Sequence, residues 1–282
     1  MRIRNAFRPN RLGCAAIFAL AIGAAAASST AQAQNDYTAI NVSDGGTITG
    51  TVKWGGPVPR VPKLPVTKDV KLCDPDSLKM RDLERLVIGS DNGVANTVVF
   101  LRDISKGKPM DLPEERQHLD QNTCRYVPHI LIVPMGGKLQ IKSTDPVLHT
   151  VQMSGAASNN IPFPFQNTYI PVSLPRNGIV ELKCNAGHVW MNANLLVVRH
   201  PYYAVTDEHG SFKLTDVPEG EYEIVAWHEG WQILSEAKTL DVAAQAEVKR
   251  PIYSSPSTWA RKVAVKPGAT AEVNFTIGEK KE

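Results

Sequence analysis

Short runs of β-branched and aromatic residues recur along most of this chain, separated by turn-forming residues. Val, Ile and Thr suit the pleated surface of a sheet, whereas Gly, Pro and Asn or Asp favour tight turns. Many short strands with such punctuation are typical of a sandwich or barrel, so the sequence predicts an all-β fold. The expected strands are Gly46–Trp54, Ala95–Leu101, Ile130–Val133, Lys138–Ser143, His149–Met153, Gly178–Lys183, Ala193–Val198, Tyr203–Val205, Gly210–Leu214, Glu221–Trp227 and Ala271–Ile277.

Helical periodicity is scarce in this sequence. It favours a helix at Asp76–Leu86, after the turn-forming pair Asp74-Pro75, and a turn or two near Pro113–Leu119. The proline-rich stretch Pro57–Pro65 indicates an extended connector between regular elements.

The N-terminal residues have the pattern of a signal peptide. Four arginines precede an uncharged apolar run from Cys14 to Ala27, and the triplet Ala31-Gln32-Ala33 fits the cleavage rule. We therefore predict a signal peptide over residues 1–33, cleavage after Ala33, and a periplasmic or secreted protein. Loss of the four arginines changes the formal charge from +3 to −1, so no basic excess predicts nucleic-acid binding. No later apolar run is long enough to predict a transmembrane anchor.

Three cysteines remain after the predicted cleavage. An odd number in an oxidising compartment leaves one thiol without a partner. Cys73 and Cys124 lie in polar, turn-like surroundings, whereas Cys184 follows an alternating strand and precedes a His and a Met. A disulfide between Cys73 and Cys124 is the favoured pairing, although sequence alone leaves the connectivity open.

The C-terminal flank contains Thr206-Asp-Glu-His-Gly-Ser-Phe212 and then Val217-Pro-Glu-Gly-Glu-Tyr222. This pattern resembles the carboxypeptidase regulatory-like, or transthyretin-like, β-sandwich. Such domains open with strands like Ile48–Val52 and Val98–Leu101, which here precede the histidine-rich part of the chain. The resemblance implies one sandwich, formed by residues 34–120 and 201–282, that is interrupted by a second β domain at residues 121–200.

The central part contains an aromatic-x-Pro strand at Tyr126-Val-Pro128, a Gly136-Gly137 turn, a turn from Ser143 to His149, and the loop Cys184-Asn-Ala-Gly-His188-Val-Trp-Met191. This arrangement resembles a cupredoxin. The resemblance implies a Greek-key cupredoxin-like β-sandwich, inserted in or packed beside the transthyretin-like one. It also implies one type 1 copper ion with His149, Cys184, His188 and Met191 as ligands.

Ligand chemistry independently favours copper. Two imidazoles, a thiolate and a weak thioether suit an ion that alternates between a soft and a borderline state, whereas zinc rarely takes a Met ligand. Three residues separate Cys184 from His188, where two or four are more usual, and Gly187 could absorb this difference because it tolerates unusual backbone angles. Taken singly, a buried Cys or Met is more often a packing residue.

Four further residues are candidates for the surroundings of the metal: His129, Trp190, His228 and Glu229. The favoured explanation of His129 is a half-buried strand residue, and that of His228 and Glu229 is a capped strand end with aromatic packing. His118, His200 and His209 have turn-like neighbours, and we expect them to be solvated.

A copper site predicts one-electron transfer, with a redox protein such as a cytochrome or dehydrogenase as the partner. The expected port is an exposed edge of His188, and Trp190 with Phe163–Phe165, part of the apolar loop Ile161–Phe165, would form the docking surface. The sequence has no His-x-His pair, nucleophile elbow, phosphate-binding loop or HExxH helix, so an enzyme is not predicted. Two alternatives stay open: a binding module for a glycan or an envelope protein, and a copper carrier.

Overall fold

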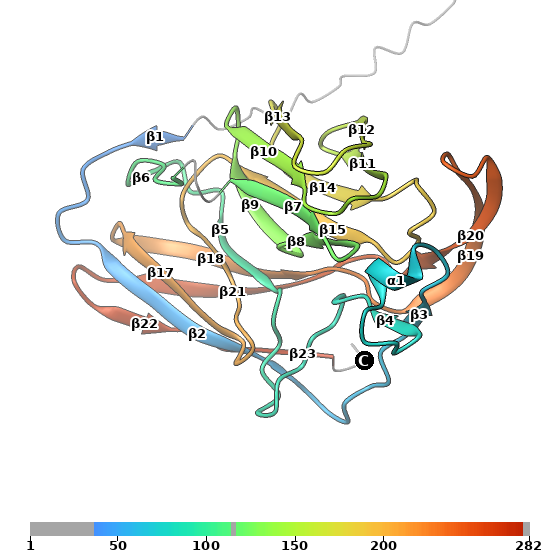
Figure 1. The fold of residues 1–282 in the computed structure, drawn as a ribbon. Helices are drawn as coiled ribbons and strands as arrows, with labels where there is room; N and C mark the ends of the chain where they lie inside the picture. Colours follow the sequence, from blue (N-terminus) through green and yellow to red (C-terminus); the bar gives the residue numbers. More distant parts are fainter. Residues whose placement is uncertain (1–36, 114–116, 279–282) are drawn as a thin grey trace, which may run out of the picture. The chain divides into compact units, whose positions relative to one another are not determined.

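The computed structural model describes residues 37–113 and 117–278. The predicted signal peptide lies outside these residues, as do three residues of the helical turn expected near Pro113–Leu119. Strands dominate the described part of the chain, and its one α-helix, α1, spans only Val70–Cys73. The prediction of an all-β sandwich fold is confirmed (Figure 1).

Two sheets enclose a first core. One has the strand order β13-β10-β7-β8, and the other has the order β12-β11-β14-β15-β9. Their strands are β7 (His118–Asn122), β8 (Arg125–Val127), β9 (Ile130–Pro134), β10 (Lys138–Ser143), β11 (His149–Gly155), β12 (Asn159–Phe163), β13 (Tyr169–Ser173), β14 (Gly178–Lys183) and β15 (Asn192–Val198). We call this pair of sheets the first sandwich. Its core includes Leu139 and Ile141, which alternate with more exposed residues along β10.

Two further sheets enclose a second core. Their strand orders are β16-β5-β18-β21 and β17-β2-β22, with β23 also paired to β2. Their strands are β2 (Gly46–Trp54), β5 (Val98–Arg102), β16 (Tyr203–Val205), β17 (Ser211–Val217), β18 (Gly220–His228), β21 (Ser257–Val265), β22 (Thr270–Glu272) and β23 (Phe275–Ile277). We call this pair the second sandwich. It combines strands that precede the first sandwich in the chain with strands that follow it, and its assignment to a transthyretin-like domain stays a prediction.

A small apolar cluster joins the two sandwiches. Leu196 and Val198 on β15 contact Val98 and Trp227, which belong to β5 and β18. Alternate residues of β15, such as Leu195, face the first core instead. Because β15 is buried on both faces, its sequence is almost continuously apolar.

Two strand pairs and α1 lie near the loop that follows β14. A hairpin of β19 (Ile233–Asp241) and β20 (Ala246–Tyr253) contacts this loop, because the Val242 amide donates to the Asn185 carbonyl at 2.9 Å. On the other side, β3 (Lys63–Pro65) pairs with β4 (Met80–Asp82), and α1 lies between them in the chain. A disulfide joins Cys73, the last residue of α1, to Cys124. The two remaining short strands, β1 (Thr38–Ala39) and β6 (Lys106–Gly107), pair with each other.

The predicted helix at Asp76–Leu86 is wrong. This stretch contains β4 and irregular turns, in which Ser77, Lys79 and Glu84 have positive φ angles that interrupt a helix. Its apolar residues serve different cores: Leu83 packs in the first sandwich and Leu86 in the second.

The stretch Ile161–Phe165 is not simply a loop, because β12 includes its first three residues and pairs with β11. Several strands escaped prediction altogether, among them β7, β13, β19, β20 and β21. Within the described residues, no helix has the length and apolar character needed to cross a membrane.

Candidate metal centre

One thiol and two imidazoles meet inside the first sandwich, at the end where β11 begins and β14 ends. His149 is the first residue of β11, while Cys184 and His188 belong to the loop that follows β14. The Nδ1 atoms of the two imidazoles are 3.2 Å apart, and Cys184 Sγ lies 3.9 Å from His149 Nδ1 and 3.7 Å from His188 Nδ1. All three side chains are fully buried.

The spacing of these atoms suits a single metal ion. The circle through three points with these separations has a radius of about 2.1 Å, close to the usual metal–imidazole bond length of about 2.0–2.1 Å and slightly below the metal–thiolate length of about 2.3 Å. These three atoms could therefore all bind one ion.

Carboxylates hold the opposite nitrogens of both rings. His149 Nε2 lies 2.9 Å from Asp145 Oδ2, and His188 Nε2 lies 2.8 Å from Asp69 Oδ2. An Nε2–H that donates to a carboxylate leaves the Nδ1 lone pair free, and this is the tautomer that a metal at Nδ1 requires. Both rings are thus oriented toward Cys184.

The surroundings of Cys184 favour its thiolate. The backbone N–H of Thr150 donates to Sγ at 3.4 Å, and the guanidinium of Arg250 donates to the Cys184 carbonyl oxygen. Burial raises the pKa of Cys184, but hydrogen bonds and charges from His149 and His188 outweigh burial and lower the pKa to about 5. A thiolate at neutral pH is the form that binds metals.

The same contacts act on His149 in the opposite direction. Burial lowers its pKa, but hydrogen bonds to Asp145 and Cys184 raise the pKa to about 9. The isolated site therefore resembles an ion pair between a thiolate and an imidazolium, and a bound cation would take the place of the proton.

Met191 and Trp190 follow His188 in the same loop. Met191 is buried in the core of the first sandwich, and its backbone N–H donates to the His188 carbonyl at 3.0 Å. The Trp190 ring meets the His188 ring edge-on, with centroids 5.5 Å apart, and its indole N–H donates to the Cys124 carbonyl. Gly187 has a φ of +81°, in keeping with the expectation that it absorbs the unusual loop length.

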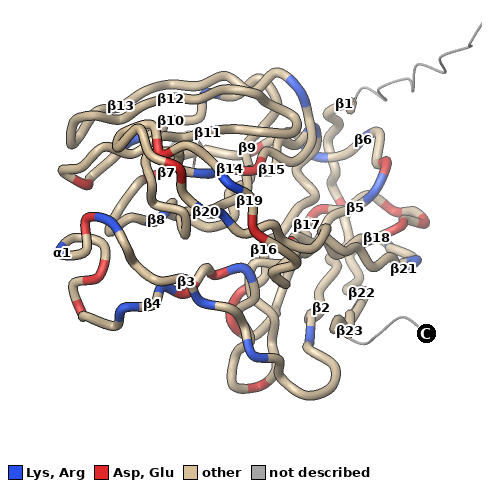
Figure 2. The backbone as a smooth tube through the Cα atoms, turned by 90° about the vertical axis from the view of Figure 1, so that its right-hand side faces the viewer, with Lys and Arg blue, Asp and Glu red and all other residues tan. Residues whose placement is uncertain are grey.

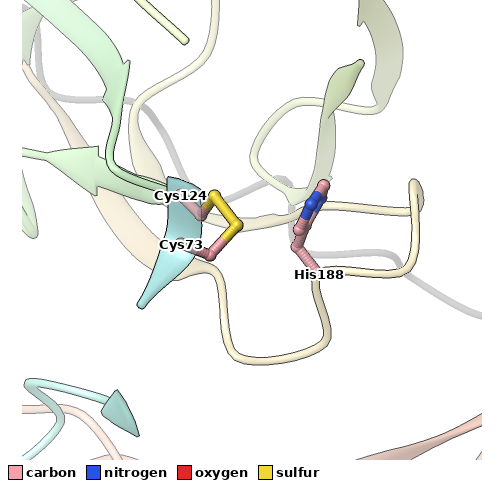
Figure 3. A group of neighbouring side chains, drawn as sticks. All are labelled: Cys73, Cys124 and His188. Atoms are coloured by element: carbon pink, nitrogen blue, oxygen red, sulfur yellow. A yellow bond between two sulfur atoms is a disulfide. The ribbon is translucent and has the colours of Figure 1, made fainter. Parts of the chain in front are cut away.

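The disulfide lies next to the two imidazoles. Figure 3 shows the bonded sulfurs of Cys73 and Cys124 beside the ring of His188. Ligand-type atoms of these three residues lie within 4.8 Å of one another, as do those of Cys124, Asp145 and His149. Because disulfide sulfurs are not thiolates, neither group offers the soft donor that Cys184 provides.

His129 and Glu229 belong to a separate buried cluster between the sandwiches. The Glu229 carboxylate accepts hydrogen bonds from the Arg85 guanidinium and from the Asn194 amide, and it also contacts His129 Nε2. The neighbouring His228 is buried too, and its Nδ1 contacts the Glu229 carbonyl oxygen. These residues pair with one another, whereas Asp145 and Asp69 hold the rings at the thiolate.

The expected port is wrong, and only part of the expected docking surface is exposed. His188 has no exposed edge, because Asp69 covers Nε2, and Trp190 and Phe163 are buried in the core. Of the predicted docking residues, Phe165 is strongly exposed. His200 is also buried instead of solvated, whereas His118 and His209 are exposed.

Sequence reasoning missed both carboxylates. Asp145 had a usable signal, because it lies four residues before His149 in the turn that leads to this ligand. Asp69 had none, since it is 119 residues away from His188 in the chain.

Comparison with known proteins gives structural likenesses alone: no family model and no curated protein matches this chain. A Cu-containing nitrite reductase from Thermus scotoductus SA-01 is 14% identical over 32% of this chain, with a TM-score of 0.28, and the match spans 23% of the reductase. A purple cupredoxin from Nitrosopumilus maritimus is 17% identical over 29% of this chain and 98% of its own, with a TM-score of 0.25. Amicyanin from Paracoccus versutus is 12% identical over 31% of this chain and 86% of its own, with a TM-score of 0.27. The matched structures thus include a cupredoxin and a copper-containing enzyme, each similar to about a third of this chain.

Proposed function

We propose that this chain is a mononuclear copper protein that transfers single electrons. His149, Cys184 and His188 are the strong ligands, and Met191 is a weak fourth ligand. The observation that carries the proposal is the convergence of two Nδ1 atoms and one thiolate sulfur on a circle of ion-binding radius, with a carboxylate on the far side of each ring.

The donor set distinguishes copper from zinc. Structural zinc sites have four strong ligands in a tetrahedron, whereas the described residues bring three strong donors together here, and the weak fourth ligand that we propose is the thioether of the buried Met191. Two imidazoles, one thiolate and a weak axial ligand are the set used by copper in electron transfer. A bound copper ion would supply a one-electron couple between its two oxidation states.

The enclosure of the site favours an electron carrier over a copper carrier. Both imidazoles are fully buried and hydrogen-bonded at the nitrogen that does not face the thiolate. Fixed ligands reorganise little when the charge on the ion changes, but they also impede the release of the ion.

We place the protein in the periplasm or outside the cell, with a redox protein such as a cytochrome or dehydrogenase as its partner. The support is the signal-peptide pattern of the first 33 residues together with the disulfide, which suits an oxidising compartment.

Addition of Cu(II) to the protein lacking residues 1–33 tests this function. We expect an intense visible absorption from thiolate-to-copper charge transfer, and Cys184→Ser should lose it while keeping the circular dichroism of the folded protein. Met191→Leu should retain copper but shift the absorption and the potential, because the axial ligand tunes both. Met153→Leu is the matched control, since Met153 is equally buried in the same core, and it should leave both unchanged. A wild-type protein that stays colourless with Cu(II) would refute the proposal.

A second candidate function, glycan binding, is favoured by a separate pocket of about 260 Å³. Trp54, Trp231 and Trp259 line it together with Gln232 and the buried His228, whose Nε2 has no hydrogen-bond partner among the described residues. Indole rings and free polar groups suit a hydroxylated ring. Oligomers of glucose, galactose and N-acetylglucosamine should then change tryptophan fluorescence in wild type but not in Trp259→Ala, and the absence of any response in wild type would eliminate this candidate.

A further inference from the structure

The nitrogen of His188 that points away from Cys184 is covered by a distant part of the chain. Asp69 reaches it from the segment between β3 and β4, and its carboxylate is about one-third exposed, with 34% of its side-chain surface accessible. Asp69 therefore lies between the buried ring and solvent. We call residues 66–82 the cap segment.

Local structure places Asp69 at this position. Its backbone is left-handed, with a φ of 46°, a conformation that Asp tolerates better than most residues. Its carbonyl accepts from the amides of Leu72 and Cys73, which fixes the last two residues of α1 to it. The neighbouring Lys68 forms an ion pair with Asp241 of β19 at 2.7 Å. Acidic and basic residues both occur along the cap segment (Figure 2), and the Lys68–Asp241 pair joins it to the β19–β20 hairpin.

The disulfide connects the supports of the two imidazoles. On one side, Cys73 ends α1, which follows Asp69 directly. On the other side, the backbone N–H groups of Thr123 and Cys124 donate to the Asp145 carboxylate, which holds His149. One covalent bond thus ties both carboxylates into a single unit.

The Cys73–Cys124 disulfide is inaccessible to reagents in solution. Both cysteines are fully buried, and the carbonyl of Cys124 accepts from the Trp190 indole inside the core. A buried disulfide of this kind acts as a permanent tether, since a thiol must reach a sulfur to exchange with it.

We propose that the cap segment is a cover for the metal centre, that Asp69 is the positioning residue for His188, and that the Cys73–Cys124 disulfide holds this cover closed. The inference rests on the proposed copper function. Its consequence is that the cap controls both the exchange of the ion and the charge felt by His188, so metal retention and redox potential both depend on a residue that does not touch the metal.

Two substitutions separate the contact from the charge. Asp69→Gly removes the side chain but keeps the left-handed backbone at low cost, whereas Asp69→Asn keeps a hydrogen-bond acceptor and loses the negative charge. We expect a chelator to remove copper at least about tenfold faster from Asp69→Gly, because loss of such an outer partner commonly weakens metal sites by about 10–100-fold. Asp69→Asn should release copper at nearly the wild-type rate. Both variants should have a higher reduction potential, since a negative charge that favours Cu(II) is lost.

The matched control is Asp76→Gly, an exposed acid of the same segment, which should change neither quantity. The double variant Cys73→Ala/Cys124→Ala should release copper at least as fast as Asp69→Gly; should it fail to fold, the Asp69 variants decide. If Asp69→Gly released copper at the wild-type rate and had the wild-type reduction potential, the inference would be overturned.

A measurement on the metal-free protein distinguishes failure of the proposal about the cap segment from failure of the proposed copper function. In the metal-free protein, NMR should detect a slowly exchanging Nε2 proton on His188 that disappears in Asp69→Gly. If wild type takes up no copper, the proposed function fails, while this proton still tests the cap. Rapid exchange of that proton in wild type would refute the cover itself.

Discussion

At the scale of single residues, both ring nitrogens of His149 and of His188 have assigned partners. One nitrogen of each ring faces the thiolate and the other faces a carboxylate. Rotation of either ring would therefore break two interactions at once. These hydrogen bonds orient both rings toward Cys184.

Gly187 is required by both its backbone angle and its neighbours. Its φ of +81° disfavours any side chain, and an added Cβ would lie 2.2 Å from Asp241 Oδ2. We expect Gly187→Ala to lower the free energy of unfolding by more than about 2 kcal/mol and to accelerate copper release, as measured by urea denaturation and chelator challenge.

Gly136→Ala is the control that measures the cost of a positive φ angle without a steric contact. Gly136 has a similar φ of +77° but open space around its Cβ position, so a loss of about 1–2 kcal/mol is expected. Equal losses in the two variants would show that the contact with Asp241 contributes nothing.

His200 should make stability depend on pH. Burial, aided by the charge of Arg199, lowers its pKa from 6.5 to about 4. Between these two pKa values, His200 binds a proton in the unfolded chain but not in the folded chain. The free energy of unfolding therefore falls as the pH drops from about 6.5 to about 4, by about 3 kcal/mol in total. Above pH 6.5, His200 is neutral in both states and its titration does not reduce the free energy of unfolding.

Substitution of His200 by Asn should flatten this dependence. Asn can still accept the hydrogen bond that the Tyr202 amide now donates to His200 Nδ1 at 3.3 Å. The measurement is the free energy of unfolding of wild type and variant across this pH range. His209→Asn, at a largely exposed histidine, should follow the wild-type curve. An unchanged slope in His200→Asn would contradict the assignment.

Sequence could predict that His149, Cys184 and His188 lie together, because one strand and one short loop bring them close. Local order then nearly determines proximity. Asp69 could not be found in this way, since its position depends on a disulfide and on a turn without any sequence pattern tied to His188.

At the scale of elements, the hairpin β19–β20 packs against the loop Cys184–Met191 and supports it. Arg250 on β20 donates to the carbonyls of Cys184 and Val189, which begin and nearly end the loop. Because hydrogen bonds from a charged donor to backbone are worth about 1.5–3 kcal/mol, the hairpin contributes to loop order directly.

Arg250→Met keeps much of the apolar stem and removes both hydrogen bonds. We expect a loss of about 2 kcal/mol in unfolding free energy and faster removal of copper by a chelator. Lys249→Met, at the exposed neighbouring position on the same strand, should have little effect on either. Unchanged copper retention in Arg250→Met would show that the loop keeps its shape without the hairpin.

The hairpin also shows why some strands could not be predicted. Most residues of β19 are exposed, so its sequence lacks the alternation of apolar and polar residues that marks a half-buried strand. The opposite error occurred at Asp76–Leu86, where Leu83 and Leu86 have helical spacing but pack into different cores. Tertiary packing overrode the local pattern in both places.

At the scale of the whole molecule, the buried cluster around Glu229 connects the two sandwiches. Glu229 follows β18 of the second sandwich, while His129 and Asn194 come from the first. Burial raises the pKa of Glu229, but interactions with His129 and Arg85 outweigh burial and lower it, which favours the ionised carboxylate.

Glu229→Gln should destabilise the fold strongly without affecting the metal centre. Removal of the charge leaves Arg85 buried and uncompensated, which costs about 3–5 kcal/mol. The exposed pair Glu223–Arg102 provides the control, and Glu223→Gln should cost less than about 1 kcal/mol. Urea denaturation measures the loss, and the visible absorption of the copper form should keep its wavelength. A loss below about 1 kcal/mol for Glu229→Gln would contradict this role.

The path of the chain has a consequence for any attempt to transplant the copper-binding part. Phe100 on β5 pairs with Tyr203 on β16, so the chain leaves the second sandwich and returns to it at adjacent strands. A cassette cut at these two points would carry every predicted ligand into a new host. It would leave behind Asp69, half of the disulfide, and Arg250, which come from the chain on either side of the cut. We expect such a graft to take up copper but to retain it poorly. The ligands lie within the transplanted stretch of the sequence, whereas the residues that support and cover them lie outside it.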